Sequence, residues 1–137
     1  MSRHIAALIA AVALLSSTGC STLADARAAK GSGQTRVYNA SFDQVWNAVP
    51  NALKELGLKE EGYNKGSGYV VARNAMMVGE KIPVAGMEDN LAVFVEKGDS
   101  AGQTRVEVVA KSAVPLNPLS KKWEVRVLDK LSEKFPR

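Results

Sequence analysis

Two pairs of adjacent acidic residues are the side chains of this sequence best suited to chemistry. Glu60 and Glu61 form one pair, and Glu88 and Asp89 form the other. General acid and base catalysis needs two carboxyl groups that face one cavity in different environments. Neighbours on a strand point to opposite faces, so Glu60 and Glu61 fit this requirement poorly. Glu88 and Asp89 precede a strand pattern and are typical of a turn, and nothing nearby supports a hard-cation site. We interpret both pairs as solvated acids.

Histidine and cysteine, the usual catalytic and zinc-binding residues, are almost missing from the sequence. The chain has 137 residues, with one histidine, His4, and one cysteine, Cys20. Serine–histidine and cysteine–histidine catalysis would need side chains that the body of the chain lacks. The same holds for a zinc site built from His and Cys ligands. The sequence therefore predicts a protein that is not an enzyme and that binds no metal or other cofactor.

Cys20 follows a segment that is typical of an export signal. Arg3 and His4 form a short basic start, and eleven apolar residues, 5–15, come next. A helix of that length spans about 16 Å, which is too short for the roughly 30 Å core of a bilayer. A basic start, a short apolar run and small residues after it describe a secretory signal peptide. We therefore expect residues 1–19 to be removed from the mature protein.

Two cleavage reactions fit the end of this leader. Ser17, Thr18 and Gly19 are small enough for an ordinary signal peptidase, which would leave a free thiol. The stretch LLSSTGC, residues 14–20, resembles the lipobox of bacterial lipoproteins, whose cysteine sulfur receives a diacylglycerol. The resemblance implies that Cys20 is lipid-modified and becomes the first residue of the mature protein. A lone exposed thiol is a liability in an oxidising compartment, and this favours the lipidated form.

Residues 20–34 are expected to join the lipid to the domain as a flexible tether. They are small and polar and end in Gly31-Ser32-Gly33. A flexible chain of this length has an r.m.s. reach of about 20 Å. In having Ser21 directly after the cysteine, the sequence resembles lipoproteins that are sent to the outer membrane. We therefore expect a protein that is lipid-anchored at the periplasmic face of the outer membrane.

A helix pattern begins the remaining part of the chain, residues 35–137. Ser41 and Gln44 have the spacing of a capping box, and Gly57 supplies the residue that commonly follows the last turn. Pro50 lies inside this pattern and should kink or split the helix. A second amphipathic helix is expected to start at Asn117 and Pro118.

Alternating apolar residues predict the strands between and before these helices. The expected strands are residues 35–38, 58–63, 68–73, 90–97 and 104–111, with a brief edge strand at 82–84. One face of the strands is apolar and the other is mixed. The elements predict one α+β domain, an antiparallel sheet of about four to six strands with two helices on one face. This two-layer sandwich has the order β-α-β-β-(β)-β-β-α.

The first helix and the elements after it resemble a known class of domains. The stretch SFDQVW at residues 41–46, LGL at 56–58, a hairpin with a glycine turn and a closing amphipathic helix carry the resemblance. They resemble small Gram-negative lipoprotein domains of unknown function. They are also similar to the helix-grip domains of the lipoprotein C subunit of the outer-membrane barrel assembly machine. The resemblance concerns the fold, and it transfers no binding residue to this chain.

Four basic residues of the C-terminal helix are the candidate surface binding residues. Lys122, Arg126, Lys130 and Lys134 recur at four-residue steps beside an apolar stripe. A basic row next to an apolar one suits a membrane surface or an acidic groove. Alternatively, these stems surround the rim of a core helix while their charges stay in water.

The anchor, the tether and the missing catalytic residue types predict a function in binding. We expect a non-catalytic adaptor domain that binds another protein of the cell envelope. The alternative is a domain that binds a lipid or small amphiphile in a cleft between the helices and the sheet. The chain carries a formal net charge of +4, but an exported, membrane-tethered protein rarely meets nucleic acid. We therefore expect no nucleic-acid partner.

Overall fold

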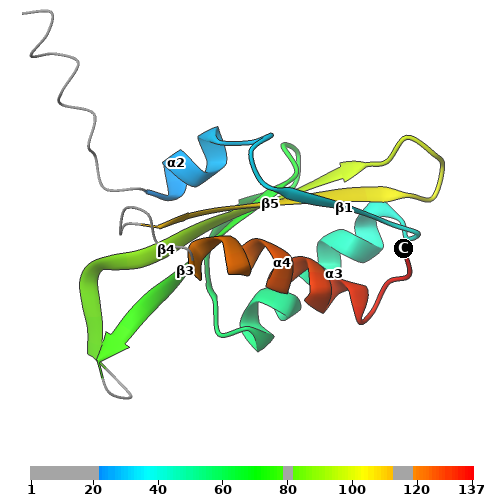
Figure 1. Cartoon of the computed structure of the whole chain (residues 1–137). Helices are drawn as coiled ribbons and strands as arrows, with labels where there is room; N and C mark the ends of the chain where they lie inside the picture. The colour runs from blue at the N-terminus through cyan, green and yellow to red at the C-terminus, as the bar shows by residue number, and fades with distance from the viewer. Residues whose placement is uncertain (1–21, 79–81, 113–118) are drawn as a thin grey trace, which may run out of the picture.

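A five-stranded antiparallel sheet carries helices on both of its faces (Figure 1). The computed structural model describes residues 22–78, 82–112 and 119–137. Its elements are α2 (Leu23–Ala28), β1 (Gln34–Tyr38), α3 (Phe42–Glu55), β2 (Lys59–Asn64), β3 (Tyr69–Val78), β4 (Ile82–Lys97), β5 (Thr104–Ser112) and α4 (Leu119–Ser132). The strands lie in the order β1-β5-β4-β3-β2, so β2 to β5 form a meander and β1 lies beside β5. The α+β fold expected from the sequence is confirmed.

Helix α3 begins and ends where the sequence predicts. The Ser41 hydroxyl accepts a hydrogen bond from the Gln44 N–H, and the Gln44 side chain accepts one from the Ser41 N–H. Gly57 follows the helix with a φ of 76°, a conformation that glycine adopts without steric cost. Of the two predicted effects of Pro50, a kink or a split, the split is wrong, because one helix runs through it. Pro50 has no N–H, so the Trp46 carbonyl group four residues earlier loses its helical hydrogen bond, but the proline itself is exposed.

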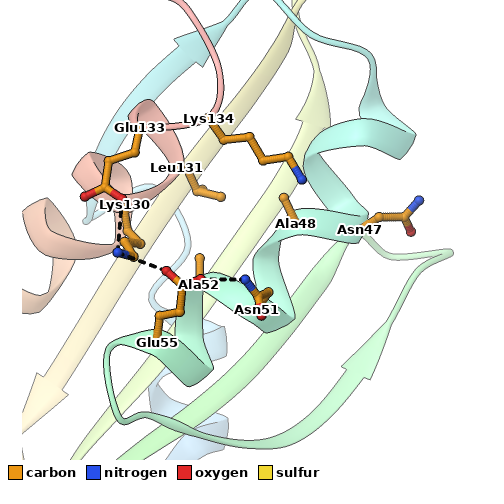
Figure 2. A pocket seen from close by; sticks show the side chains of 9 residues that line it. All are labelled: Asn47, Ala48, Asn51, Ala52, Glu55, Lys130, Leu131, Glu133 and Lys134. Carbon is orange, nitrogen blue, oxygen red and sulfur yellow. Dashed lines mark hydrogen bonds and ion pairs between the residues drawn. The ribbon is translucent and has the colours of Figure 1, made fainter.

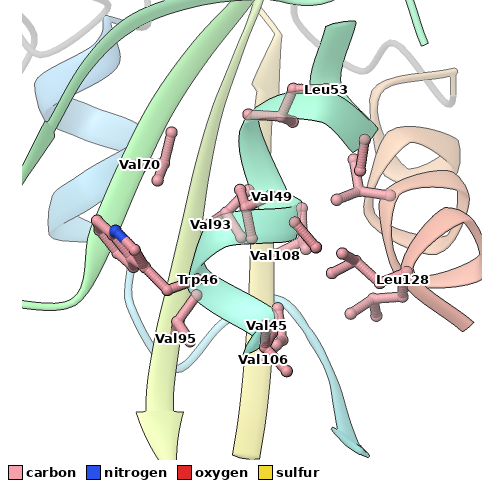
Figure 3. Close-up of a cluster of buried hydrophobic side chains, with 14 of the residues drawn as sticks. Val45, Trp46, Val49, Leu53, Val70, Val93, Val95, Val106, Val108 and Leu128 are labelled. Carbon is pink, nitrogen blue, oxygen red and sulfur yellow. The ribbon is translucent and has the colours of Figure 1, made fainter. Parts of the chain in front are cut away.

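The main core lies between the sheet and the pair α3 and α4 (Figure 3). Alternate residues of the central strands supply one side of it, and the apolar stripes of the two helices supply the other. The buried members include Val45, Val49, Leu53, Leu91, Val93, Val95, Val106, Val108, Leu128 and Leu131. The expected apolar face of the sheet is therefore the face that the two helices cover.

Helix α2 covers the second face of the sheet, so the prediction of two layers and the prediction of a flexible tether are both corrected. Residues 20–34 were expected to be a flexible tether, but Thr22 caps a helix through a capping box with Asp25. Ala26 of this helix is fully buried, and it packs with the buried strand residues Ala92, Phe94 and Val109. Both faces of β4 and β5 therefore carry apolar side chains, and the second set is buried only if a third layer covers it.

The hairpin of β3 and β4 is longer than the sequence suggests. Residues 82–84 are in a strand, as expected, but the prediction of a separate brief edge strand is wrong, because Ile82 begins β4, which continues to Lys97. Antiparallel pairing extends from Tyr69 opposite Phe94 to Val78 opposite Ile82. The predicted start of the last helix at Asn117 and Pro118 lies outside the described residues, as do the leader and Cys20.

Candidate functional site

Two hollows of the surface lie on either side of α3. The first, the helix groove, has a volume of about 410 Å³ and lies between α3 and α4 (Figure 2). Its lining consists of Asn47, Ala48, Asn51, Ala52, Glu55, Lys130, Leu131, Glu133 and Lys134. The second, the aromatic hollow, has a volume of about 310 Å³ and lies between α3 and the strands β2 and β3. Its lining consists of Trp46, Pro50, Glu60, Tyr63 and Val70.

The spacing of residues in α3 and the pairing of β2 with β3 together bring the lining of the aromatic hollow into place. Trp46 and Pro50 are four residues apart in α3 and therefore share one side of the helix. Tyr63 of β2 lies directly opposite Val70 of β3, and paired residues project from the same face of a sheet. Phe42 stacks on Trp46 with ring centroids 5.8 Å apart and fixes the indole. The hollow thus has an apolar wall, with the Glu60 side chain also in its lining.

Tyr63 is the unusual residue of this site. Its side chain is 68% exposed, and it is the only aromatic among the large exposed apolar side chains in the described ranges. A tyrosine combines a large apolar ring with a hydroxyl group that donates and accepts hydrogen bonds. Such a side chain beside an apolar hollow can bind an apolar group and a polar neighbour together.

A lysine between two carboxylates bridges the helix groove. The Lys130 Nζ lies 2.9 Å from Glu55 Oε2 and 3.0 Å from Glu133 Oε2. The Asn51 side chain donates a hydrogen bond of 2.7 Å to Glu55. Ala48, Ala52 and Leu131 add apolar side chains to the lining. The charges of the groove therefore largely neutralise one another.

The electrostatics of the helix groove oppose acid–base chemistry. Hydrogen bonds from Lys130 and Asn51 lower the pKa of the Glu55 carboxyl group. The Glu55 and Glu133 carboxylates raise the pKa of the Lys130 ammonium group. A general acid needs a raised carboxyl pKa, and a nucleophilic lysine needs a lowered one. Both groups are therefore tuned to stay charged at neutral pH.

The four candidate residues of α4 do not share one surface. Each four-residue step turns about 40° around a helix axis, so the row winds across the helix. Lys130 faces Glu55 of α3. The Arg126 guanidinium lies over the Trp123 ring, 4.4 Å from its centroid. Lys122 is exposed on α4, and Lys134 follows the end of the helix. Lys130 and Lys134 both line the helix groove.

The two acidic pairs of the sequence are divided among separate partners. Glu60 lines the aromatic hollow, and Glu61 lies 3.5 Å from the Lys59 ammonium group.

The prediction that Glu88 and Asp89 lie in a turn is wrong, because both are in β4. Glu88 lies 3.3 Å from the Arg73 guanidinium. Asp89 is not a solvated acid, because it is buried and accepts a hydrogen bond of 3.1 Å from the Trp123 indole. Across residues 22–78, 82–112 and 119–137, no three His, Cys, Asp or Glu side chains form a group that could hold a metal ion.

Two buried glutamates, which the sequence did not mark as special, bind backbone N–H groups. Glu107 accepts hydrogen bonds from the N–H groups of Gly31 and Gly33 at 2.8–3.1 Å. Glu124 accepts one of 3.0 Å from Ala110 in β5. Strand β1 pairs with β5 only as far as Val108. Glu124 therefore binds an N–H group of β5 that β1 does not reach. Both acids are structural, and their only sequence signal is an acid within an apolar pattern.

Comparison of the chain with models of known protein families and with curated protein sequences gave no match.

The described part of the chain includes no helix of the length and apolar character needed to cross a membrane.

Proposed function

We propose that this protein is a lipoprotein, anchored through Cys20 to the periplasmic face of the outer membrane, whose domain binds another envelope protein without catalysis. The leader and the stretch LLSSTGC support the anchor. The observation that carries the binding function is the exposed Tyr63 beside the aromatic hollow. We assign the partner contact to this surface and not to the basic residues of α4.

The composition of the aromatic hollow favours a protein partner. Tyrosine and tryptophan are enriched among the hot-spot residues of interfaces, whose truncation costs about 2 kcal/mol or more. Pro50 also supports a binding role for the hollow, because an interior proline lowers helix stability by about 3 kcal/mol relative to alanine. A residue that opposes its own helix and also lines a hollow is typical of a functional surface.

The partner is expected to insert a side chain and not to add a strand. Strand β2 is at the edge of the sheet, but a bulge between Glu60 and Gly62 interrupts its register. Lys59 and Lys65 are exposed at its two ends. Bulges and lysines are the features that protect edge strands from pairing with other chains. An apolar or aromatic side chain that enters the hollow beside Tyr63 avoids this barrier.

The filled core supports this proposal over the binding of an amphiphile between the helices and the sheet. Val45, Val49 and Leu53 of α3 are buried against strand residues there. The aromatic hollow, at about 310 Å³, is at the small end of the roughly 300–1,000 Å³ range of ligand pockets. One inserted side chain fits this space better than a long acyl chain does.

Photo-crosslinking in cells tests the proposal. A photoreactive amino acid replaces Tyr63 in the full chain, and a second strain carries it at Val125, which is 43% exposed on α4. We expect one specific envelope protein to crosslink at position 63 and not at position 125.

Affinity for that crosslinked protein provides the quantitative arm of the test. Loss of the ring in Tyr63→Ala should weaken binding about 30-fold, which corresponds to about 2 kcal/mol. Val125→Ala should leave the affinity unchanged. Equal crosslinking at both positions, or equal affinity of both variants, would overturn the assignment.

A further inference from the structure

Very little chain separates Cys20 from the folded domain. The described structure begins at Thr22, two residues after Cys20. Two residues of fully extended chain span at most about 7 Å. Thr22 is held in place, because its backbone N–H donates a hydrogen bond of 2.6 Å to the Asp25 carboxylate. A lipid on Cys20 would therefore be attached close to the N-terminus of α2.

Helix α2 is fixed to the sheet by contacts along its length. Ala26 is fully buried. The Arg27 guanidinium donates a hydrogen bond of 2.9 Å to the Tyr69 hydroxyl and lies over the Tyr69 ring. Lys30, directly after the helix, forms an ion pair with Glu96. An anchor at the start of this helix therefore holds the sheet as well.

The chain that follows α2 is fixed too. The N–H groups of Gly31 and Gly33 bind the buried Glu107 carboxylate. Gly33 lies so close to β5 that an added Cβ would be 2.0 Å from the Val108 carbonyl oxygen. Together these contacts hold the connection between α2 and β1 in one position against the sheet.

We propose that the α2 side of the sheet lies against the phospholipid headgroups of the membrane that holds the lipid. This inference rests on the proposed acylation of Cys20. Helices α3 and α4 cover the opposite face of the sheet (Figure 1). The short connection therefore selects which of the two faces meets the bilayer.

The exposed surface of α2 suits a headgroup layer. Ala24 and Ala28 are exposed and small, so the helix can approach the surface closely. Arg27 and Lys30 are exposed and basic, and each lies over an aromatic ring, of Tyr69 and Phe94 respectively. Basic side chains are attracted to anionic headgroups. The acidic residue of the helix, Asp25, is engaged in its cap, and Glu96 is paired with Lys30, so Arg27 is the main basic group available to a headgroup.

This orientation leaves the aromatic hollow open to the periplasm. Tyr63 lies opposite Val70, and Val70 is part of the core under α3. The hollow is therefore on the helix side of the sheet, away from the bilayer. A partner could reach Tyr63 without displacing lipid.

Depth-dependent fluorescence quenching tests the orientation on the acylated full chain. The chain is reconstituted into vesicles of phosphatidylethanolamine and phosphatidylglycerol that contain a nitroxide-headgroup lipid. A fluorophore is placed through Ala28→Cys on α2 or, as the matched control, through Asn47→Cys on α3; both positions are exposed. We expect at least threefold stronger quenching at position 28.

The outcomes separate this inference from the proposed function. A chain that floats with the vesicles but shows equal quenching at positions 28 and 47 would overturn the orientation alone. A chain that does not float would overturn both the acylation and the orientation. Fifteen Gly and Ser residues inserted after Ser21 should lower the ratio of quenching at position 28 to quenching at position 47 at least twofold. An unchanged ratio in this variant would contradict the role of the short connection.

Discussion

Tyr38 joins the first strand to the last helix through a buried hydrogen bond. Its hydroxyl donates to the Leu128 carbonyl oxygen at 2.5 Å, and the side chain is fully buried. The Ser132 hydroxyl also donates to that carbonyl, at 3.0 Å. Tyr38→Phe should therefore lower the free energy of unfolding by only about 1 kcal/mol, measured by urea denaturation. Tyr63→Phe, a change at an exposed site, should alter it by less than about 0.5 kcal/mol.

The same residue predicts a loss of stability at high pH. Burial raises the pKa of the Tyr38 phenol, so the folded protein prefers the neutral form. Its stabilising contribution is complete below the ordinary tyrosine pKa of about 10 and is lost as the pH rises through the raised value. The stability difference between the wild type and Tyr38→Phe should therefore shrink above that pH. A difference that grows would contradict this assignment.

Single residues of the candidate site were the hardest features to predict from the sequence. The basic residues of α4 stand out by their spacing, yet their environments differ. Lys130 contacts Glu55 of α3, which is distant in the sequence, and Arg126 lies over the ring of Trp123. Tyr63 carries no motif. Its exposure follows from the pairing with Val70 at the edge of the sheet, and that pairing is set by the bulge in β2. Spacing along one element cannot reveal a hollow that two elements form together.

At the scale of single elements, Pro50 lowers the stability of α3 and at the same time forms part of the lining of the aromatic hollow. Pro50→Ala restores a backbone N–H inside the helix and should raise the free energy of unfolding by about 1–3 kcal/mol. The same change removes a wall of the aromatic hollow, so the yield of the crosslink from position 63 should fall. Asn47→Ala, at another exposed position of α3, is the control; it should leave the crosslink yield unchanged and raise the free energy of unfolding by less than about 0.7 kcal/mol. A destabilised Pro50→Ala chain would refute this interpretation.

The link between α2 and β1 depends on the absence of a side chain at Gly33. A Cβ at this position would lie 2.0 Å from the Val108 carbonyl oxygen. Gly33→Ala should therefore cost about 1–3 kcal/mol or more and should speed tryptic cleavage after Lys30. A Cβ at Gly62 would meet Val71 at an ordinary 3.6 Å, so Gly62→Ala is the matched control. Equal stability of the two variants would show that this close approach is unimportant.

Elements with strong local signals were predicted well, and those fixed by tertiary packing were not. The cap at Ser41, the glycine at Gly57 and the alternation in β4 and β5 each act within a few residues. Helix α2 has only six residues, and isolated helices of that length are unstable in water. It forms because Ala26 is buried on a second apolar face of the sheet. That face was visible in the sequence at Ala92, Phe94 and Val109, but it was interpreted as mixed.

The whole molecule has two faces with different proposed tasks. The α2 face follows the anchor by two residues and is assigned to the membrane. The α3 and α4 face carries Tyr63 and is assigned to a protein partner. The membrane assignment depends on acylation of Cys20, and the choice of an envelope protein as the partner depends on export. The orientation of the molecule in the cell envelope therefore depends on acylation of Cys20.

Mass spectrometry of the chain purified from its native membranes tests the acylation of Cys20 most directly. We predict a mature N-terminus at Cys20 that carries a diacylglycerol on its sulfur, with residues 1–19 removed. Cys20→Ala should abolish both the modification and sedimentation with membranes. A free thiol at the processed N-terminus, or a chain that retains residues 1–19, would contradict the account.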